Sequence, residues 1–319
     1  FPGRLAYKTI SVLYAVFQKD AIRYFRHVET ALFSSLFAGN TVLAYHDLSF
    51  LENSALMKLL IRISHQKARK VGFITTTQAG RSRLLSWGVA STQICVAPNG
   101  IDLEQFVDLK PARLKPNLPN TEKEIGFAGS LYPGRGIEEI IEAAQILKDS
   151  NFFVVGGQAA DIERCERIAK RQGITNIHFL GFLPQQIMYQ YLAAFDILIM
   201  PYTTDTPTYR DMSPMKMFEY MAAGKPIVAT DFPVIREVLQ HNGNAVLVSP
   251  DSGTALPDGI QWCRRNPQEA QRLETQSHKD VANYTWTKRD ELIKTGISAD
   301  TSVFTKASTA PTKHLNNHT

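Results

Sequence analysis

Residues 125–148 read IGFAGSLYPGRGIEEIIEAAQILK, and this stretch holds one complete unit of the predicted fold. It begins with a short apolar run over 125–128, turns through 129–136, and continues as a helical pattern over 137–148. A buried strand, a glycine-rich turn and an amphipathic helix are typical of a parallel sheet covered by helices on both faces. The stretch therefore predicts an α/β fold.

The same unit recurs along most of the chain. Further short apolar runs, each followed by a turn and a helical pattern, occupy residues 41–45, 72–75, 94–97, 152–155, 177–180, 197–200, 227–229 and 245–248. A region with three prolines and little periodicity lies between Asp108 and Glu124, and such composition suits an interdomain linker. The pattern predicts two doubly wound parallel-sheet domains.

We place the first domain at residues 1–112 and the second at 113–284. Only three clear strands precede the linker and the chain begins with Phe1 rather than Met, so the first domain is expected to be incomplete at its start. A helix over 285–297 follows the second domain. The remaining residues, 298–319, are rich in Ser, Thr, Ala and Asn and are expected to be disordered.

Composition narrows the class of protein. Hydrophobic residues make up 44% and charged residues 20% of the 319, which is ordinary for a soluble globular chain. Three widely spaced cysteines without ligand spacing argue against a disulfide scaffold or a zinc site and for a reducing compartment. No spanning helix or signal peptide is evident, and we expect a cytoplasmic location.

Positive charge is concentrated in the first third of the chain. Residues 1–112 contain 13 basic and 7 acidic residues, whereas the rest is nearly neutral. This excess suits an anionic substrate or a membrane surface, and an ordinary solvated face is the alternative. The cluster Arg23, Tyr24, Phe25 and Arg26 likewise admits either a peripheral membrane contact or a core phenylalanine with solvated arginines.

The densest chemical signal lies in residues 211–228, DMSPMKMFEYMAAGKPIV. Ser213 as N-cap and Pro214 at the first position predict a helix that ends at Gly224. Its first turn offers free N–H groups and the positive end of the helix dipole, which favour phosphate. Lys216 and Glu219 share one face, so together they can bind a phosphate and the hydroxyls of a ribose. A plain surface Lys/Glu pair is the alternative.

The turn over 129–136, GSLYPGRG, is a second candidate for phosphate contact. Glycine lets the backbone approach a phosphate, and the Arg135 guanidinium can bond two of its oxygens. The spacing is neither GxGxxG nor GxxxxGK[ST], so it argues against a P-loop nucleotidase.

These motifs together resemble a known family. Residues 96–102, 129–136, 180–184, 194–202 and 211–228 are similar, in this order, to the C-terminal half of retaining glycosyltransferases of family 4, which have the GT-B fold. The resemblance extends from about residue 41 to residue 290. It implies two Rossmann-like domains facing across a cleft, the first for the acceptor and the second for a nucleotide sugar, with the last helix crossing back to the first domain.

The resemblance also implies roles for single residues in the second domain. Glu219 matches the acidic residue that binds the ribose, and Lys216 and Arg135 match basic positions that hold the diphosphate. Gly181 and Phe182 match the segment that meets the base, while the helix start brings Ser213, Pro214 and Met215 to the donor. Two positions depart from the family: Asp211 replaces the glutamate that faces the donor sugar, and Ser130 stands where an arginine is frequent.

In the first domain the candidate is His46, which ends a strand together with Asp47. Ligand sites of α/β proteins gather at the carboxyl ends of strands. The resemblance matches His46 to a residue that meets the transferring sugar, and a structural histidine is the alternative.

The predicted function is transfer of a sugar from a nucleoside diphosphate donor, preferably UDP-linked such as UDP-glucose, to a glycan or lipid-linked hydroxyl in polysaccharide or glycoconjugate biosynthesis. The chain contains no Asp-x-Asp sequence, so we expect neither a metal nor another cofactor. Nucleic acid is not expected as a partner, and a contact with the inner face of the membrane stays open. The alternatives are a noncatalytic subunit that binds nucleotide sugar and an epimerase or phosphorylase of the same fold.

Overall fold

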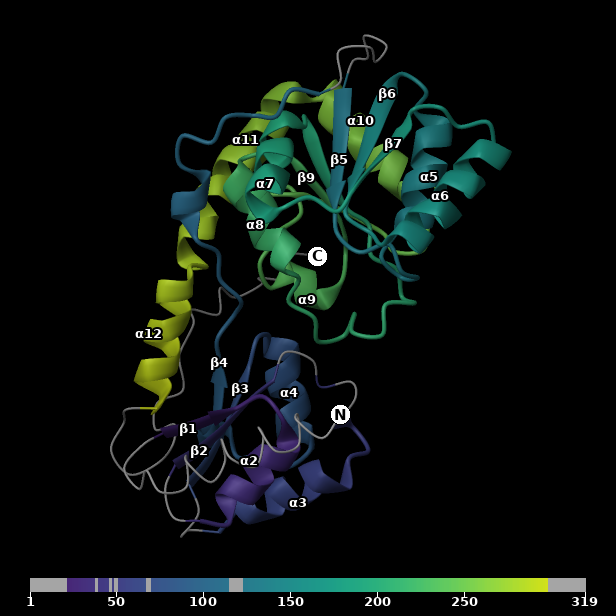
Figure 1. Ribbon diagram of the computed structural model, residues 1–319. Helices are drawn as coiled ribbons and strands as arrows, with labels where there is room; N and C mark the ends of the chain where they lie inside the picture. The colour runs from purple at the N-terminus through teal and green to yellow at the C-terminus, as the bar shows by residue number, and fades with distance from the viewer. Residues whose placement is uncertain are drawn as a thin grey trace, which may run out of the picture. The chain divides into compact units, whose positions relative to one another are not determined.

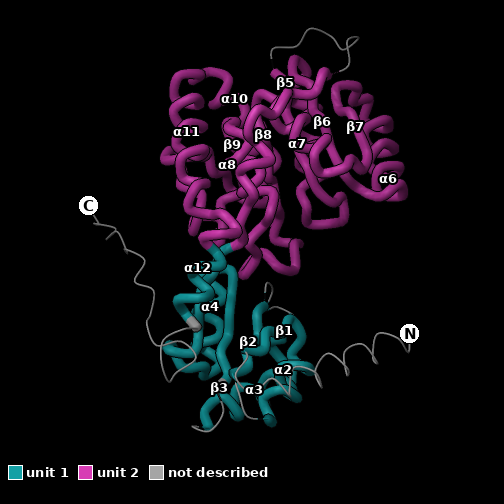
Figure 2. The backbone as a smooth tube through the Cα atoms, turned by 60° about the vertical axis from the view of Figure 1, so that its left-hand side comes forward, with its two compact units in different colours: residues 1–98, 289–319 teal, residues 99–288 magenta. Residues whose placement is uncertain are grey.

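The computed structural model describes residues 22–37, 40–45, 48, 51–66, 70–114 and 123–297. His46 and Asp47 and the tail over 298–319 lie outside these residues, and so does most of the proline-rich linker. The chain divides into two compact units, shown in two colours in Figure 2. Unit 1 extends to Pro98 and resumes at Arg289, and unit 2 consists of Asn99–Lys288.

In the described residues of unit 1, four parallel strands form a sheet in the order β1-β2-β3-β4. Buried side chains of α2, α3 and α4 form a core on one face, and Leu292 and Ile293 of α12 pack on the other. Its elements are β1 (Ile22–Phe25), α2 (Val28–Ser35), β2 (Asn40–Tyr45), α3 (Ala55–Ser64), β3 (Lys70–Thr75), α4 (Gln78–Ser86), η2 (Ser91–Gln93), β4 (Ile94–Val96) and most of α12 (Trp286–Ile297).

Unit 2 is a six-stranded parallel sheet in the order β10-β9-β8-β5-β6-β7. Its elements are η3 (Leu103–Phe106), β5 (Lys123–Ala128), α5 (Ile137–Ile146), β6 (Ser150–Val155), α6 (Ala159–Arg171), β7 (Ile177–Gly181), α7 (Gln185–Ala194), β8 (Ile197–Met200), α8 (Met215–Ala223), β9 (Ile227–Thr230), α9 (Pro233–Arg236), β10 (Val246–Val248), α10 (Ala255–Arg265), α11 (Pro267–Asp280) and η4 (Val281–Asn283).

Helices cover both faces of the unit 2 sheet, as the sequence predicts. Alternate side chains of β5, β6 and β8 enter one core with α5, α6 and α10. On the other face the Phe195 ring at the end of α7 stacks on Phe153 and lies against Gly126, where a Cβ would be 1.9 Å from the ring. Figure 1 shows α5 and α6 on one side of the strands and α7 and α8 on the other. The α/β class with two parallel sheets is confirmed.

The strand order fixes where a ligand site belongs in unit 2. The chain runs from β5 outward through β6 and β7, then returns to the other side of β5 with β8. Ligands of such sheets bind at the carboxyl ends of the strands where the order reverses. The switch point therefore lies between β5 and β8, and the loops over 129–136 and 201–214 begin there.

Three details differ from the sequence-based expectations. The first unit ends at Pro98, before the expected boundary at residue 112, because the segment after it packs on unit 2: Ile101 N donates to the Tyr284 carbonyl at 2.9 Å and Ala112 N to the Gln190 carbonyl at 2.9 Å. A strand, β1, occupies residues 22–25 and was not expected. Within β1, Phe25 packs on the core, in agreement with one of the two alternatives for this cluster, but Arg23 is 3% exposed and not solvated as that alternative required.

Gly136 closes the turn after β5 in a conformation that requires glycine. Its φ is +80°, and a Cβ there would lie 1.8 Å from the Pro201 carbonyl oxygen. Gly173 has a similar φ of +68°, but a Cβ added there would have no heavy atom within 4 Å. Gly173→Ala should therefore cost about 1 kcal/mol of backbone strain, and Gly136→Ala on the order of 3 kcal/mol because a clash adds to the strain. Chemical denaturation measures both losses, and an equal decrease in the free energy of unfolding of the two variants would contradict this difference.

Candidate functional site

Two loops form the floor of the site at the switch point, and hydrogen bonds join them. The Gly134 carbonyl in the loop after β5 accepts from Thr203 N at 3.1 Å and from the Thr206 hydroxyl in the loop after β8. The Tyr220 hydroxyl of α8 also accepts from Ala128 N at 2.8 Å, at the end of β5. These bonds hold Arg135 and the start of α8 in one place.

The helix predicted from Ser213 begins one residue later than expected. Pro214 is the N-cap with ψ 128°, and Met215 is the first helical residue. The Ser213 carbonyl accepts from Asn99 Nδ2 at 2.8 Å, and its side chain does not cap the helix. The predicted end is confirmed, because Gly224 is the C-cap with φ 60°. The first turn of α8 still presents the positive end of the helix dipole.

Arg135 and Lys216 are surrounded by aromatic rings. Arg135 Nη1 donates to the Tyr202 hydroxyl at 2.9 Å, and its guanidinium lies 4.4 Å from the Tyr132 ring centre. Lys216 Nζ lies 3.8 Å from the centre of the Phe127 ring and 5.0 Å from that of Tyr202. Among the described residues, Lys216 Nζ and Arg135 Nε are buried without a hydrogen-bond partner. Two cations with free hydrogen-bonding capacity are what an anionic group requires.

The charges of the site influence one another. Burial lowers the pKa of Lys216 well below its usual value, and the neighbouring Arg135 lowers it further, whereas Glu219 raises it. Burial raises the pKa of Glu219, whereas the charge of Lys216 and a hydrogen bond with Tyr189 lower it. A bound anion would offset the free-energy cost of burying the Lys216 ammonium, because an opposite charge favours the protonated lysine.

The structure brings several predicted residues together. Lys216 is within electrostatic reach of both Arg135 and Glu219, and Gly129 adjoins Lys216: a Cβ at Gly129 would lie 2.5 Å from Nζ. Asp211, 3% exposed, is buried in the loop that leads to α8.

The other predicted positions lie on the neighbouring strand ends or outside the described residues. Gly181 ends β7 and its carbonyl accepts from Gly156 N at 2.7 Å, while Phe182 is 82% exposed. Ser130 is exposed beside Gly129. His46 falls outside the described residues, so its role stays a prediction.

Sequence reasoning missed the aromatic residues that hold the cations. Tyr132 lies in the turn that supplies Arg135, and Tyr202 follows β8 directly in the sequence Met200-Pro-Tyr202. The position of Tyr202 at the carboxyl end of a strand beside the switch point was the available signal.

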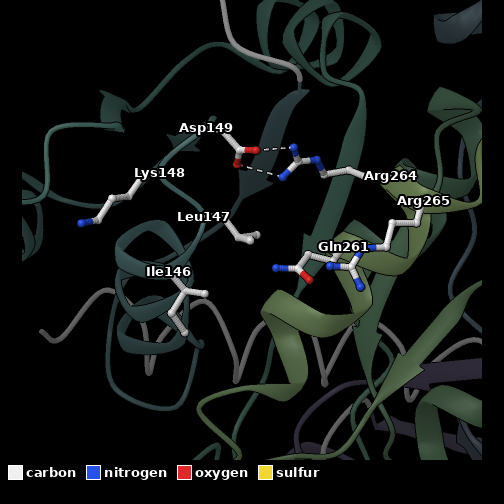
Figure 3. A pocket seen from close by; sticks show the side chains of 7 residues that line it. All are labelled: Ile146, Leu147, Lys148, Asp149, Gln261, Arg264 and Arg265. Atoms are coloured by element: carbon white, nitrogen blue, oxygen red, sulfur yellow. Dashed lines mark hydrogen bonds and ion pairs between the residues drawn. The ribbon is translucent and has the colours of Figure 1, made fainter.

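A hollow of about 510 Å³ lies at the opposite end of the unit 2 sheet (Figure 3). Its lining comes from the ends of α5 and α10, where Arg264 forms an ion pair with Asp149. The carboxyl ends of helices carry the negative end of the dipole, which is unfavourable for phosphate. Lys148 and Arg265 also line the hollow, but it lies away from the carboxyl ends of the strands, where ligands of such sheets bind.

The sequence model of the family described as "Glycosyl transferases group 1" matches residues 110–280. This chain belongs to that family.

The chain also resembles individual relatives, at low sequence identity. The chain is 25% identical over 196 residues to a putative colanic acid biosynthesis glycosyl transferase, WcaI, of Escherichia coli, covering 59% of this chain and 48% of the relative. It is 28% identical over 240 residues to an N-acetylgalactosaminyltransferase of Campylobacter jejuni whose name specifies a diphospho-undecaprenol substrate, covering 72% and 59%. The chain spans about half the length of the curated relatives it matches.

Among solved structures, Anabaena Alr3699/HepE in complex with UDP and glucose superposes with a TM-score of 0.73 at 19% identity, over 93% of this chain and 83% of that one. The likeness shows that the fold is GT-B.

None of the helices in the described residues combines the length and the apolar composition that a membrane span requires.

The buried charge of Lys216 should lower the stability of the folded chain. Replacing Lys216 by methionine removes an unpaired ammonium from the interior, so the free energy of unfolding at neutral pH should rise by on the order of 1 kcal/mol. Because the folded-state pKa of Lys216 is lowered, its cost is fully present below that pKa and fades as the pH rises toward the usual value of 10.5. In denaturation experiments, the stability that Lys216→Met gains over the parent should therefore become smaller as the pH rises. A variant that is less stable than the parent at every pH would contradict this interpretation.

Proposed function

We propose that this chain is a retaining glycosyltransferase of family 4 that transfers a hexose from a nucleoside diphosphate sugar to a hydroxyl of a glycan or lipid-linked acceptor. The observation that carries the proposal is a pair of cationic side chains, Arg135 in the turn after β5 and Lys216 in the first turn of α8, whose Nε and Nζ lack hydrogen-bond partners among the described residues. Glu219 lies three residues after Lys216 on the same helix. Cations and a helix N-terminus suit a diphosphate, and a carboxylate can accept hydrogen bonds from a ribose.

The names of the relatives support the substrate classes. The Escherichia coli relative belongs to colanic acid biosynthesis and the Campylobacter one acts on a diphospho-undecaprenol compound. These names support a role in polysaccharide or glycoconjugate biosynthesis with a lipid-linked acceptor. The HepE complexes with UDP and with UDP-glucose support a UDP-linked donor. A lipid-linked acceptor would place the reaction at the inner face of the membrane, approached from the cytoplasm.

The proposed reaction depends on stabilising the leaving group. The bond between the anomeric carbon and the β-phosphate oxygen breaks, and negative charge accumulates on that phosphate. Arg135, Lys216 and the first N–H groups of α8 would stabilise this charge. The acceptor oxygen then bonds the anomeric carbon on the face that the phosphate leaves, and its proton passes to the departing phosphate. The anomeric configuration is retained, and no protein nucleophile is required.

The roles that follow for other residues are part of the same proposal. Gly181 and Phe182 would meet the base, and Asp211 and His46 would contact the sugar. Ser213, Pro214 and Met215 would bring backbone groups to the donor, and Ser130 would adjoin its phosphates. No metal is needed in this scheme, because Arg135 and Lys216 supply the positive charge.

A donor screen tests the proposal. Thermal shift against UDP-, GDP- and ADP-sugars should single out a UDP-sugar, and NMR of the product from that donor and a lipid-linked acceptor should show a retained anomeric centre in EDTA. An inverted product, or activity that EDTA abolishes and manganese restores, would overturn the mechanism. Binding without turnover would favour a noncatalytic subunit. An epimer formed from donor alone, or sugar phosphate formed from glycan and phosphate, would favour the remaining alternatives.

A further inference from the structure

Arg135 of unit 2 donates to a tyrosine hydroxyl, as Arg210 does to Tyr209 at 2.9 Å, whereas other arginines of this unit are ion-paired. Four others pair with a carboxylate: Arg164 with Glu138 at 2.8 Å, Arg272 with Glu269 at 2.8 Å, Arg236 with Asp231, and Arg264 with Asp149. Arg135 instead donates to the Tyr202 hydroxyl and lies against two tyrosine rings. Its partners within the described part of the chain are therefore neutral.

Neutral partners have a chemical consequence at an anion site. A carboxylate would fix Arg135 but would also neutralise it and compete with phosphate for the same N–H groups. An aromatic face attracts the guanidinium through its quadrupole and leaves the N–H edge available. A phenol occupies only one N–H group, Nη1, at 2.9 Å. The two tyrosines can therefore restrict the long arginine side chain without cancelling its charge.

Tyr202 also links the two cations. Its ring centre lies 5.2 Å from the Arg135 guanidinium carbon and 5.0 Å from Lys216 Nζ, and its side chain is 2% exposed. Like charges repel each other, and an aromatic ring next to both cations attracts each of them. The titratable and charged groups that act on Lys216 are Arg135 and Glu219.

We propose that Tyr132 and Tyr202 are positioning residues that hold Arg135 in place for the diphosphate of the donor while leaving its charge uncompensated. This inference rests on the proposed function, since it assumes that the ligand of Arg135 is a diphosphate. The two tyrosines act through Arg135 and do not need to touch the ligand.

A double-mutant cycle tests this dependence, with UDP and inorganic pyrophosphate as the probes in calorimetry. Tyr202→Phe removes only the hydroxyl from a buried ring and should weaken UDP binding about tenfold. Tyr132 is 41% exposed, so Tyr132→Leu should not affect folding, and it should weaken binding about fivefold. Tyr132→Phe keeps the ring and should stay within about twofold of the parent, as should Tyr24→Leu in unit 1, a control of similar exposure at 43%.

The decisive comparison is made in the Arg135→Ala background. There both tyrosine substitutions should change affinity by less than about twofold, because the group they position is gone. Losses of the same size in both backgrounds would overturn the inference, and so would unchanged affinity of Tyr202→Phe. If the parent chain binds UDP and pyrophosphate but the tyrosine effects are independent of Arg135, only this inference fails. If the parent chain binds neither probe, the proposed function fails with it.

Discussion

Arg135→Ala should lower the turnover of the donor sugar by about 100- to 1,000-fold, the usual effect of removing one preorganised group that stabilises developing charge. The affinity for the donor should fall much less, because the leaving phosphate gains charge only as the glycosidic bond breaks. The measurement is the rate of UDP release as a function of donor concentration, which separates kcat from KM.

The matched control is Arg272→Ala. Arg272 is an exposed arginine of unit 2 that pairs with Glu269 on α11, and its loss should leave turnover within about twofold. Unchanged turnover of Arg135→Ala would contradict the proposed role of this arginine, and so would a KM that rises while kcat stays constant. The latter result would mean that Arg135 binds substrate and transition state equally.

Glu219→Gln is expected to have the second large effect, on nucleotide binding. A hydrogen bond to a charged group contributes about 1.5 to 3 kcal/mol, so the affinity for UDP should fall by roughly tenfold or more. Affinity for pyrophosphate, which has no ribose, should not fall. Calorimetric titration with both ligands distinguishes a ribose contact from a general effect on the charge of the site.

Glu274→Gln is the control for this substitution. Burial raises the pKa of Glu274 as it does that of Glu219, but Glu274 lies on α11 near Lys225. Its substitution should leave UDP binding unchanged. Equal loss of UDP and pyrophosphate binding in Glu219→Gln would refute the ribose role.

Much of the fold could be predicted because the strands of unit 2 are continuous apolar runs. Each run over 125–128, 152–155 and 197–200 lies within an observed strand, since strands buried on both faces leave no polar alternation to misread. Gly224 was predictable as the end of α8, because a left-handed C-cap favours glycine. The candidate residues Arg135, Lys216 and Glu219 follow from the same helix and turn signals.

The features of the fold and the site that were not predicted depend on contacts between residues distant in the sequence. Just before the start of α8, the Ser213 carbonyl accepts a hydrogen bond from Asn99, which is distant in the sequence. The ring of Phe127 beside Lys216 and the hydroxyl of Tyr202 beside Arg135 likewise depend on how β5, β8 and α8 pack together. Local propensity carries no information about such neighbours. The first strand, β1, was missed because its sequence, IRYF, is not a continuous apolar run: Arg23 occupies its buried position.

Calorimetric titration of the chain with UDP in the presence of EDTA tests the central claim most directly, namely that the cations at the start of α8 hold a nucleoside diphosphate. The claim predicts one binding site per chain, with affinity at least about tenfold weaker in Lys216→Met, a variant that should be no less stable than the parent. Absence of UDP binding at millimolar concentration, or an affinity that Lys216→Met leaves unchanged, would contradict it.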